Sequence, residues 1–452
     1  MKEKLIEKVF SVKNDSLKKH KVITILGSKI KVRNPKYVAP APVNYETNTI
    51  SDLEDGFLRV RLNHTCNCKC EFCVQEEWSQ EVQNAIMPKD WLYKYLVPLY
   101  SRVKIVQLTG GEITCRKENF EFYKYLAENF PNVNVLLESN VITFDEKWQD
   151  LSVKNLGYQH FSLNTAHAET YKNGVWEQGG EAVYNKIIGN IRSCCKKWDD
   201  AGLGVFKPSV SMVVTHKTAG DVYDFIKLSL ELGLRGCIFY FAIHEGAGKD
   251  DFIYPEILGP KLKMLMEIEK VLANKFPLIF RLRLPLLITQ QYQKEVNETP
   301  IEELNAKYGE LIELAKDRNI MEEWKLRNEA RIKHGKKTFT FDEEYKTCTH
   351  TEDFLLDDGT VKNVCFAPFK ELDIMADGTM LVCGWTNWEI NIKDFIKNDT
   401  IDWAKALNNP NFRDLREKAL HCDFSRCMRY CPMHPANPHL NHFEQYGLRK
   451  EC

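Results

Sequence analysis

The middle of the chain alternates between strand-like and helix-like patterns of apolar residues. Leu58, Val60 and Leu62 are separated by Arg59 and Arg61, which is the two-residue period of a strand with one buried face. Further stretches with the apolar composition of strands are 103–108, 133–138, 158–164, 208–215 and 237–244. Apolar residues at helical spacing predict helices over 91–103, 120–130, 183–198, 222–232 and 262–276. Strands that alternate with helices in this way predict an α/β fold with a parallel sheet.

Segments of different composition flank this core. Residues 1–56 are rich in lysine and predict a short amphipathic helix, a hairpin over 22–32 and a loop; they form either a solvated lead-in or a docking element for a partner. Residues 286–347 are charged with little apolar periodicity, which predicts a solvated helical linker or, alternatively, a lid over the substrate. Residues 348–452 are rich in cysteine and predict a small α+β domain.

Composition narrows the class of protein. A chain of 452 residues is long enough for two or three domains, and 44% hydrophobic with 28% charged residues is typical of a soluble globular protein. The net charge of -1 gives no argument for nucleic acid as a partner, and no apolar run of about 18 residues predicts a membrane span. Fifteen cysteines without a secretory leader indicate a reducing compartment, so we expect a cytoplasmic protein.

Cysteines gather directly after the first predicted strand. Cys66, Cys70 and Cys73 have the spacing CxxxCxxC. Three such ligands hold three irons of a [4Fe–4S] cluster and leave the fourth iron open, whereas a cluster that only carries electrons normally has four cysteine ligands. The alternatives are a plain electron-transfer cluster and a zinc site, although zinc favours CxxC pairs. Cys68 falls outside the triplet and is predicted to be a spectator.

This loop resembles the cluster-binding loop of the radical SAM superfamily, and Phe72 matches the aromatic position before the last cysteine. The resemblance implies that the open iron binds the amino and carboxylate groups of S-adenosylmethionine. One electron then cleaves the C–S bond of this cofactor to a 5′-deoxyadenosyl radical. The resemblance also implies a partial (β/α)6 TIM-like barrel over residues 57–285, with the reactive groups at the carboxyl ends of the strands. A reductant such as flavodoxin or ferredoxin is implied as a partner.

The segment after the second predicted strand carries two glycines and a carboxylate. Gly110, Gly111 and Glu112 resemble the GGE motif of the same superfamily. Glycine allows a ligand to approach the backbone closely. The resemblance implies that the backbone and Glu112 hold the methionyl amino group of the cofactor.

Two further strand ends carry polar side chains that can hydrogen-bond ribose hydroxyls. Ser139 and Asn140 close the third strand, and Ser162 and Asn164 close the fourth. Each of these is equally typical of an Asx or Ser turn. Lys172 lies in a stretch that resembles the carboxylate-contacting region of the superfamily, where many members have arginine. Lysine cannot form the bidentate fork of arginine.

Four cysteines of the core lie outside the triplet. For Cys115, Cys194, Cys195 and Cys237 the default interpretation is a buried apolar side chain. Cys115 comes three residues after the GGE motif. It is therefore also a candidate hydrogen-atom donor or substrate contact.

The last 105 residues contain a second group of cysteines. They are Cys348, Cys365, Cys383, Cys422, Cys427, Cys431 and Cys452. The spacing of Cys365, Gly378 and Cys383 resembles the opening of a SPASM domain, which implies one auxiliary [4Fe–4S] cluster on Cys365, Cys383, Cys427 and Cys431 and a possible second one using Cys348, Cys422 and Cys452. The pattern departs from the family at Ala419, where a further cysteine is usual. A zinc site that includes His434 is the alternative.

These features together predict a radical SAM oxidoreductase of the SPASM type. The expected reaction abstracts a hydrogen atom from a C–H bond of a peptide or protein, giving oxidation, a cross-link or epimerisation. The first alternative is the same chemistry on a carbohydrate or surface-polysaccharide precursor, because the basic hairpin weakly resembles lead-ins of surface-polysaccharide biosynthesis proteins. The second is a non-catalytic iron–sulfur scaffold for electron transfer, against which the Gly-Gly-Glu motif argues.

Overall fold

The computed structural model describes residues 10–14, 20–25, 28–33, 53–73, 75, 78–241, 255–281, 292, 294–341, 344, 351–355, 361–365, 367–382, 390–420 and 425. The chain divides into two compact units, residues 1–49 and residues 50–452.

The first unit contains a three-stranded antiparallel sheet in the order β1-β2-β3. Its strands are β1 (Phe10–Asn14), β2 (His20–Ile25) and β3 (Ser28–Arg33). The hairpin expected over 22–32 is present as β2 and β3. Among the described residues before β2, residues 10–14 form β1 instead of a helix, because Phe10 and Val12 alternate with polar residues and pair with β2. Residues 1–9 and 15–19, where the expected short helix could also lie, are outside the described part of the chain.

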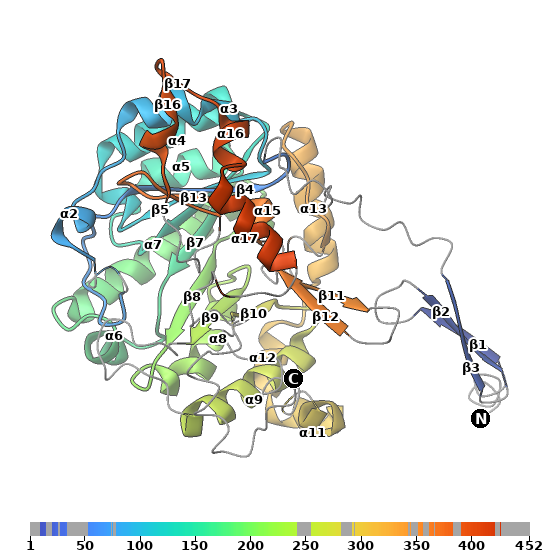
Figure 1. The fold of residues 1–452 in the computed structure, drawn as a ribbon. Helices are drawn as coiled ribbons and strands as arrows, with labels where there is room; N and C mark the ends of the chain where they lie inside the picture. The colour runs from blue at the N-terminus through green and yellow to red at the C-terminus, as the bar shows by residue number, and fades with distance from the viewer. Residues whose placement is uncertain are drawn as a thin grey trace. The chain divides into compact units, whose positions relative to one another are not determined.

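Among the described residues, the second unit is built on seven parallel strands that are neighbours in the order of the sequence (Figure 1). They are β4 (Phe57–Asn63), β5 (Ile105–Gly110), β6 (Asn134–Ser139), β7 (Tyr158–Ser162), β8 (Ser209–Val214), β9 (Cys237–Phe241) and β10 (Leu278–Arg281). All six predicted strands are present, and β10 is an additional one. The predicted α/β fold with a partial TIM-like barrel is confirmed.

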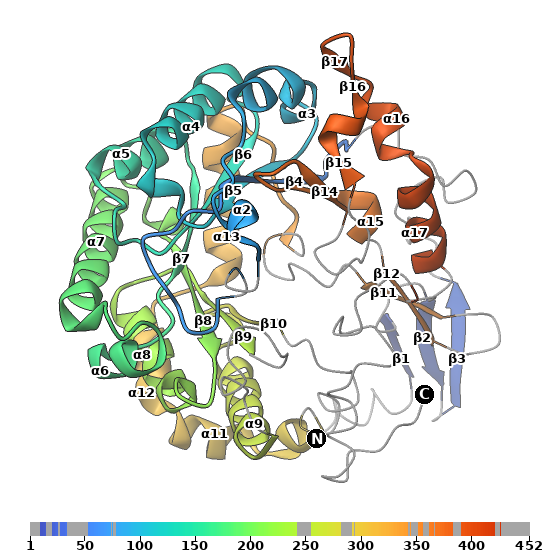
Figure 2. The same cartoon turned by 60° about the vertical axis from the view of Figure 1, so that its left-hand side comes forward.

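Helices cover the outer face of this sheet, as Figure 2 shows for α4, α5 and α7. The crossover elements are η2 (Trp91–Tyr95), α3 (Val97–Tyr100), α4 (Lys117–Asn129), α5 (Glu146–Lys154), α6 (Ala168–Gly174), α7 (Gly180–Asp200), α8 (Val222–Glu231) and α9 (Pro255–Leu272). The helix expected over 91–103 is divided into the π-helical η2 and the short α3, because Pro98 has no N–H to continue the hydrogen-bond pattern. Short elements nearby are α2 (Gln80–Gln83), η3 (Ile113–Cys115), η4 (Gly204–Phe206) and η5 (Ala219–Asp221).

The two faces of the barrel sheet differ in polarity. Leu58 and Val60 of β4 are fully buried in the apolar core. Arg59 alternates onto the opposite face, where its Nε donates to Oε1 of Gln107 on β5 at 2.9 Å. Along the same face, Thr109 donates to Glu138 of β6 at 2.9 Å. The side of the sheet away from the helices therefore carries polar and charged side chains.

The C-terminal region adds three strands to the barrel sheet. They are β13 (Glu371–Ile374), which runs parallel to β4, followed by the antiparallel β14 (Thr379–Leu381) and β15 (Ile390–Asn391). Asp373 of β13 accepts from Arg61 at 2.7 Å and from Arg59 at 3.3 Å. The resulting sheet has ten strands, and its end strands β10 and β15 are not paired with each other in the described part of the chain. As far as the structure describes the chain, the sheet is therefore open.

The charged segment before this region packs against the barrel instead of being solvated throughout. Its helices are α11 (Ile301–Lys307), α12 (Gly309–Leu314) and α13 (Ile320–Lys333). Arg327 and Arg331 of α13 are fully buried and pair with Glu344 at 2.5 and 3.0 Å. Arg327 also donates to the carbonyl of Val205, just before β8. α13 is therefore solvated on one side only, because paired arginines can be buried although the sequence pattern is that of an exposed helix.

The remaining elements are short. They are β11 (Thr351–Leu355), β12 (Val361–Cys365), α15 (Ala367–Lys370), η6 (Ile392–Phe395), β16 (Ile396–Lys397), β17 (Thr400–Ile401), α16 (Trp403–Leu407) and α17 (Pro410–Leu420). Trp403 of α16 donates to the carbonyl of Tyr95 at 2.8 Å, which ties this region to η2. Among the described helices, none combines the length and apolarity needed to cross a bilayer.

Candidate functional site

The cysteine loop begins where β4 meets the end of β5. Asn63, the last residue of β4, is fully buried, and its carbonyl accepts from the backbone N–H of Gly111 at 2.7 Å. The backbone N–H of Glu112 donates to the carbonyl of Thr65 at 3.0 Å. The side-chain amide of Asn63 also donates to the Thr65 carbonyl at 2.7 Å. The residues before Cys66 are therefore fixed against the Gly-Gly-Glu segment.

The two glycines are required by this contact between backbones. Gly110 has a φ of +152°, and a Cβ placed on it would lie 2.0 Å from the carbonyl oxygen of Asn63. A Cβ on Gly111 would lie 2.2 Å from the carbonyl oxygen of Thr65. A side chain at either position would force the two segments apart. The sequence predicted that a ligand comes close to the backbone of these glycines. In the structure, the start of the cysteine loop lies close to them.

Glu112 is buried, with 1% of its surface exposed, and its carboxylate accepts hydrogen bonds through both oxygens. Oε1 accepts from the backbone N–H of Thr114, from the Thr114 hydroxyl and from the Ser139 hydroxyl. Oε2 accepts from the backbone N–H of Asn140 at 2.6 Å and has the capacity for a second bond. Burial raises the pKa of Glu112, and the hydrogen bonds oppose that shift. The carboxylate thus joins the ends of β5 and β6.

Asn140 links this carboxylate to the first cysteine of the triplet. Its side-chain amide donates to Oδ1 of Asn67 at 2.7 Å and lies 3.8 Å from the sulfur of Cys66. Asn67 in turn donates to the hydroxyl of Thr143 at 3.3 Å, and Thr143 is 2.6 Å from the hydroxyl of Thr114. A continuous set of hydrogen bonds therefore connects Glu112 with the loop residue next to Cys66.

Residues 70–73 of the cysteine loop are held by contacts other than those that hold its start. The backbone N–H of Cys73 donates to the carbonyl of Cys70 at 3.0 Å. Glu71 donates its backbone N–H to Val175, and its carboxylate forms an ion pair with Lys217. Phe72 is partly buried against the core. The loop that carries the three cysteines is therefore held by β5, by β6 and by the segments after α6 and β8.

The predicted spectator Cys68 differs in environment from the triplet. It is buried, and its sulfur lies 3.4 Å from that of Cys70 and 3.9 Å from the hydroxyl of Tyr171. The contact with Cys68, together with burial, raises the pKa of the Cys70 thiol. In the described part of the chain, no three His, Cys, Asp or Glu side chains are placed to hold a single metal ion.

His64 joins the cysteine loop to the C-terminal hairpin, a contact that sequence reasoning missed. Its Nδ1 lies 2.7 Å from the carbonyl of Val82, and its Nε2 accepts from the backbone N–H of Ala376 at 3.4 Å. Burial lowers the pKa of His64, so the neutral ring donates through Nδ1 and accepts through Nε2. The turn between β13 and β14 is thereby attached two residues before Cys66.

Of the other residues predicted to contact the cofactor, Ser139 and Asn164 form hydrogen bonds within the protein, whereas Ser162 and Lys172 are partly or fully exposed. The hydroxyl of Ser139 is used by Glu112, and Asn164, with a φ of +67°, accepts from the backbone N–H of Val213 at 3.0 Å. Ser162 ends β7 and is partly exposed, and Lys172 is exposed on α6. The observed contacts of Ser139 and Asn164 therefore match the alternative interpretation, in which these side chains stabilise turns.

The other cysteines of the core differ in their exposure to solvent. Cys194, Cys195 and Cys237 are buried, as their default interpretation predicted. Cys115 is exposed, so the default interpretation of a buried side chain is wrong for this residue. Partial desolvation of its thiol raises the pKa of Cys115, while hydrogen bonds with Thr143 and the backbone of Asn67 lower it. These contacts bring Cys115 beside the cysteine loop.

The predicted auxiliary ligands lie outside the described residues, except that the backbone of Cys365 ends β12. The undescribed ones are Cys348, Cys383, Cys422, Cys427, Cys431 and Cys452, together with His434.

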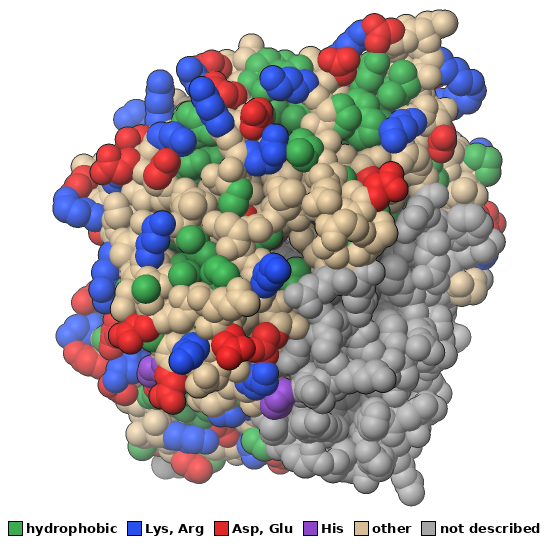
Figure 3. Space-filling model, turned by 90° about the vertical axis from the view of Figure 1, so that its left-hand side faces the viewer, with side chains coloured by type: hydrophobic (Ala, Val, Ile, Leu, Met, Phe, Trp, Pro, Cys, Tyr) green, Lys and Arg blue, Asp and Glu red, His purple; other side chains and the backbone are tan. Residues whose placement is uncertain are grey.

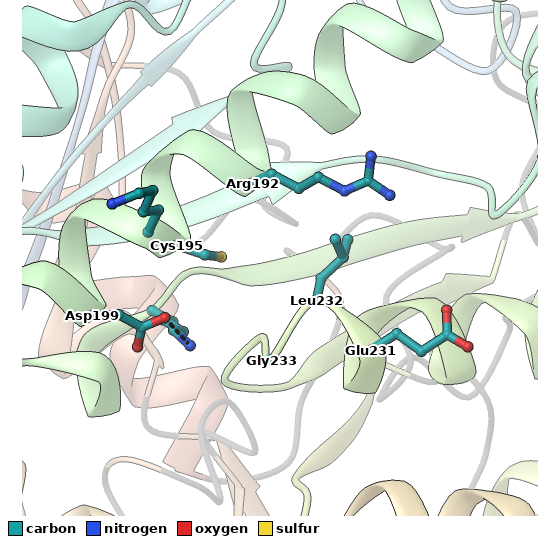
Figure 4. Close-up of a pocket in the computed structure, with 8 residues that line it drawn as sticks. Arg192, Cys195, Asp199, Glu231, Leu232 and Gly233 are labelled. Carbon is teal, nitrogen blue, oxygen red and sulfur yellow. Dashed lines mark ion pairs between the residues drawn. The ribbon is translucent and has the colours of Figure 1, made fainter.

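A cavity of about 370 Å³ lies between α7 and the end of α8 (Figure 4). Arg192, Cys195 and Asp199 line it from α7, and Asp199 pairs with Lys207 at 2.8 Å. On the face of the molecule at the left of Figure 1, lysine and arginine side chains are interspersed with acidic ones (Figure 3). No residue of the cysteine loop is among those that line this cavity.

Comparison with known proteins gives relatives of the core and structures of similar fold. No family model matches the chain. The chain is 31% identical over 199 residues to a probable GTP 3′,8-cyclase of Saccharolobus islandicus (strain Y.N.15.51 / Yellowstone #2), which covers 44% of this chain and 59% of the relative. A probable GTP 3′,8-cyclase of Sulfurisphaera tokodaii is 27% identical over 219 residues, covering 48% of this chain and 64% of the relative. The chain therefore spans about three fifths of these relatives.

Two solved structures resemble a larger share of the chain. SuiB of Streptococcus suis bound to S-adenosylmethionine has a TM-score of 0.51 at 15% identity and covers 82% of this chain and 69% of its own. A histidine-tagged anSMEcpe with bound AdoMet has a TM-score of 0.52 at 17% identity and covers 86% of this chain and 91% of its own. The likeness in fold thus extends beyond the part matched by the cyclases.

Proposed function

We propose that this chain is a radical SAM enzyme that cleaves S-adenosylmethionine at a cluster held by Cys66, Cys70 and Cys73 and abstracts a hydrogen atom from a C–H bond of a peptide or protein. The relatives matched over the core and the structures of similar fold with bound S-adenosylmethionine support S-adenosylmethionine and a [4Fe–4S] cluster as its cofactors. When bound, they supply the reductive cleavage and the abstracting radical; the protein supplies binding, orientation and protection.

The residues of the cysteine loop suit a cluster with one open iron. Three soft thiolate ligands are available within eight residues. Cys68 falls outside the CxxxCxxC spacing, and its sulfur lies 3.4 Å from that of Cys70 and 3.9 Å from the hydroxyl of Tyr171. The ends of the loop are fixed by the backbone bonds to Gly111 and Glu112 and by the ion pair of Glu71. A loop held at both ends presents its thiolates without a large ordering cost. This fixed CxxxCxxC loop is the observation that carries the proposal.

The Gly-Gly-Glu segment lies beside this loop, as a cofactor bound at the open iron requires. Oε2 of Glu112 has the capacity for one more hydrogen bond, and we assign it to the methionyl amino group. Gln75 donates to the carbonyl of Gly110 at 3.2 Å, which fixes the same segment from the loop side. Cys115 is the candidate donor of a hydrogen atom, because it is exposed and lies beside Asn67.

We assign the C-terminal cysteines to a SPASM-type auxiliary domain with one or two clusters. The attachment of β13 to β4 supports this, because it joins the region after Cys365 to the strand that leads into the cysteine loop. A small reduced electron carrier, such as flavodoxin or ferredoxin, would deliver the electron.

A peptide substrate is supported by open strand edges. In the described part of the chain, the end strands β10 and β15 of the barrel sheet are not paired with each other. In the first unit, β3 pairs only with β2 among the described strands and carries Lys29, Lys31 and Arg33. An extended acidic peptide could add to such an edge through main-chain hydrogen bonds.

A purine nucleotide is the second candidate, because the relatives matched over the core are probable GTP 3′,8-cyclases. A deuterium-transfer experiment separates the candidates. The source cells are grown in D₂O, and their extract is supplied to the anaerobic enzyme with unlabelled S-adenosylmethionine and dithionite. Deuterium should appear in 5′-deoxyadenosine only with the high-mass fraction, and protease treatment of that fraction should abolish it. Transfer from the small-molecule fraction would overturn the peptide proposal; purified GTP and a carbohydrate fraction then identify the class. Absence of 5′-deoxyadenosine in all samples would overturn the radical chemistry itself.

A further inference from the structure

Asn140 has a side-chain orientation that the surrounding hydrogen bonds fix. Its Oδ1 accepts from the backbone N–H of Ile142 at 3.1 Å, which is an Asx turn. The amide nitrogen must therefore point the other way, toward Asn67 and Cys66. Asn67 presents its oxygen to Asn140, because its own nitrogen donates to Thr143. Both amide groups are thus oriented by independent partners.

The turn that carries Asn140 is held in a strained conformation. Val141 has a φ of +69°, which is unfavourable for a β-branched residue. Its backbone N–H donates to the Ser139 hydroxyl at 2.9 Å, and its carbonyl accepts from the side chain of Asn190 on α7 at 2.8 Å. Strain of this kind persists where the surroundings over-determine it, and it often marks a functional position.

The second N–H of the Asn140 amide is directed at the sulfur of Cys66, at a distance of 3.8 Å. Cys66 is the first ligand of the proposed cluster. A hydrogen bond to a cluster sulfur stabilises the more negative, reduced state, and such bonds help to set the reduction potential of iron–sulfur clusters. The ribose contact expected from the sequence would compete with this donor.

We propose that Asn140 is a positioning residue that donates an N–H···S hydrogen bond to Cys66 and thereby raises the reduction potential of the cluster that cleaves S-adenosylmethionine. This inference rests on the proposed cluster at Cys66, Cys70 and Cys73. It assigns Asn140 to the cluster ligand and leaves the ribose of the cofactor to other groups. The network from Glu112 through Asn140 to Cys66 then couples the cofactor-binding segment to the cluster.

The test compares midpoint potentials of the reconstituted full chain by redox titration monitored by electron paramagnetic resonance. Asn140→Ser keeps an acceptor for Ile142 but removes the donor to sulfur. Asn140→Asp keeps the length and the acceptor and places a negative charge near the cluster. Asn190→Leu is the matched control, because it loosens the same turn without reaching Cys66. The signal that is lost in Cys66→Ala identifies the cluster of the triplet, and the potential of that signal is followed in all samples.

We expect Asn140→Ser to lower the midpoint potential by up to roughly 59 mV. For one electron, this shift is about a tenfold change in the equilibrium constant of reduction. Asn140→Asp should lower it further, and Asn190→Leu should leave it unchanged. An unchanged potential in Asn140→Ser with full iron content would overturn the inference alone. Loss of iron in both Asn140 variants but not in Asn190→Leu would overturn the inference by showing that Asn140 has only a structural role. A parent without a reducible cluster would overturn the proposed function as well.

Discussion

Oε2 of Glu112 lies 2.6 Å from the backbone nitrogen of Asn140, so that a buried carboxylate at the end of β5 accepts a hydrogen bond from the residue after β6. The same carboxylate accepts from Thr114 and Ser139 through Oε1. Glu112 therefore stabilises the rim of the barrel in addition to its proposed contact with the cofactor. The two contributions can be separated by experiment.

Replacing Glu112 by glutamine should weaken both contributions. An amide has one oxygen, so its NH₂ group would face either the Asn140 N–H or the donors at Oε1. We expect a loss of about 1.5–3 kcal/mol in the free energy of unfolding, the range for hydrogen bonds to a charged group. The affinity for S-adenosylmethionine should fall by roughly ten- to a hundredfold. Chemical denaturation and equilibrium dialysis measure the two effects.

Thr114→Val is the matched control for this variant. It removes one hydrogen-bond donor to Oε1 but keeps the negative charge and the free capacity of Oε2. It should lower stability with little effect on cofactor affinity, and iron content should stay unchanged in both variants because no ligand is lost. If Glu112→Gln binds the cofactor as tightly as the parent, the Gly-Gly-Glu segment has only a structural role.

Alanine at Cys66, Cys70 or Cys73 should abolish formation of 5′-deoxyadenosine. Loss of one ligand removes the support of the cubane, while the loop remains tied through Glu112 and Glu71. Cys68→Ala should behave nearly like the parent, because Cys68 is buried beside Cys70 and Tyr171 and falls outside the CxxxCxxC spacing. Anaerobic turnover assays with iron analysis make the comparison. Product formation by any of the three triplet variants would contradict the assignment.

Metal content tests the C-terminal cysteines. Anaerobically reconstituted protein should hold about eight irons per chain with one auxiliary cluster and about twelve with two, since each cubane contains four. Elemental analysis together with Mössbauer spectroscopy measures this number. One cubane plus one zinc per chain would refute the SPASM-type domain and leave the barrel assignment intact.

Asp373 should make the fold sensitive to acid. Burial by itself raises the pKa of Asp373, but Arg61 and Arg59 together hold it below its ordinary value of 3.8. A carboxylate with a lowered pKa in the folded state stabilises the fold above its unfolded pKa and loses this contribution as the pH falls through the folded pKa. Asp373→Asn should therefore cost about 3 kcal/mol at neutral pH by leaving two arginines without their partner, and progressively less below about pH 4.

Denaturant titrations from acidic to neutral pH would measure the difference between Asp373→Asn and the parent. Asp394→Asn, at an exposed position of η6, is the control and should follow the parent at each pH. A difference between Asp373→Asn and the parent that stays constant across this range would show that the ion pair does not set the acid response.

Much of the barrel could be predicted because its signals are local. The alternation around Arg59 and Arg61 and the helical spacing of α7 and α8 each lie within one element. The helix expected over 91–103 was affected by one further local feature, Pro98. For α13 the local signal was misleading, since buried arginines paired with Glu344 give the same pattern as a solvated helix.

The sequence by itself determined the parallel α/β core, the cysteine triplet and the glycines that follow the second strand. Only the tertiary structure decided that β13 joins β4, that Asp373 neutralises arginines more than 300 positions earlier, and that Asn140 points at Cys66. The physical reason is that a strand pattern fixes which face of the strand is buried but not which strand pairs with it. A polar side chain has several possible partners, and the assembled fold selects among them through hydrogen bonds between residues far apart in the chain.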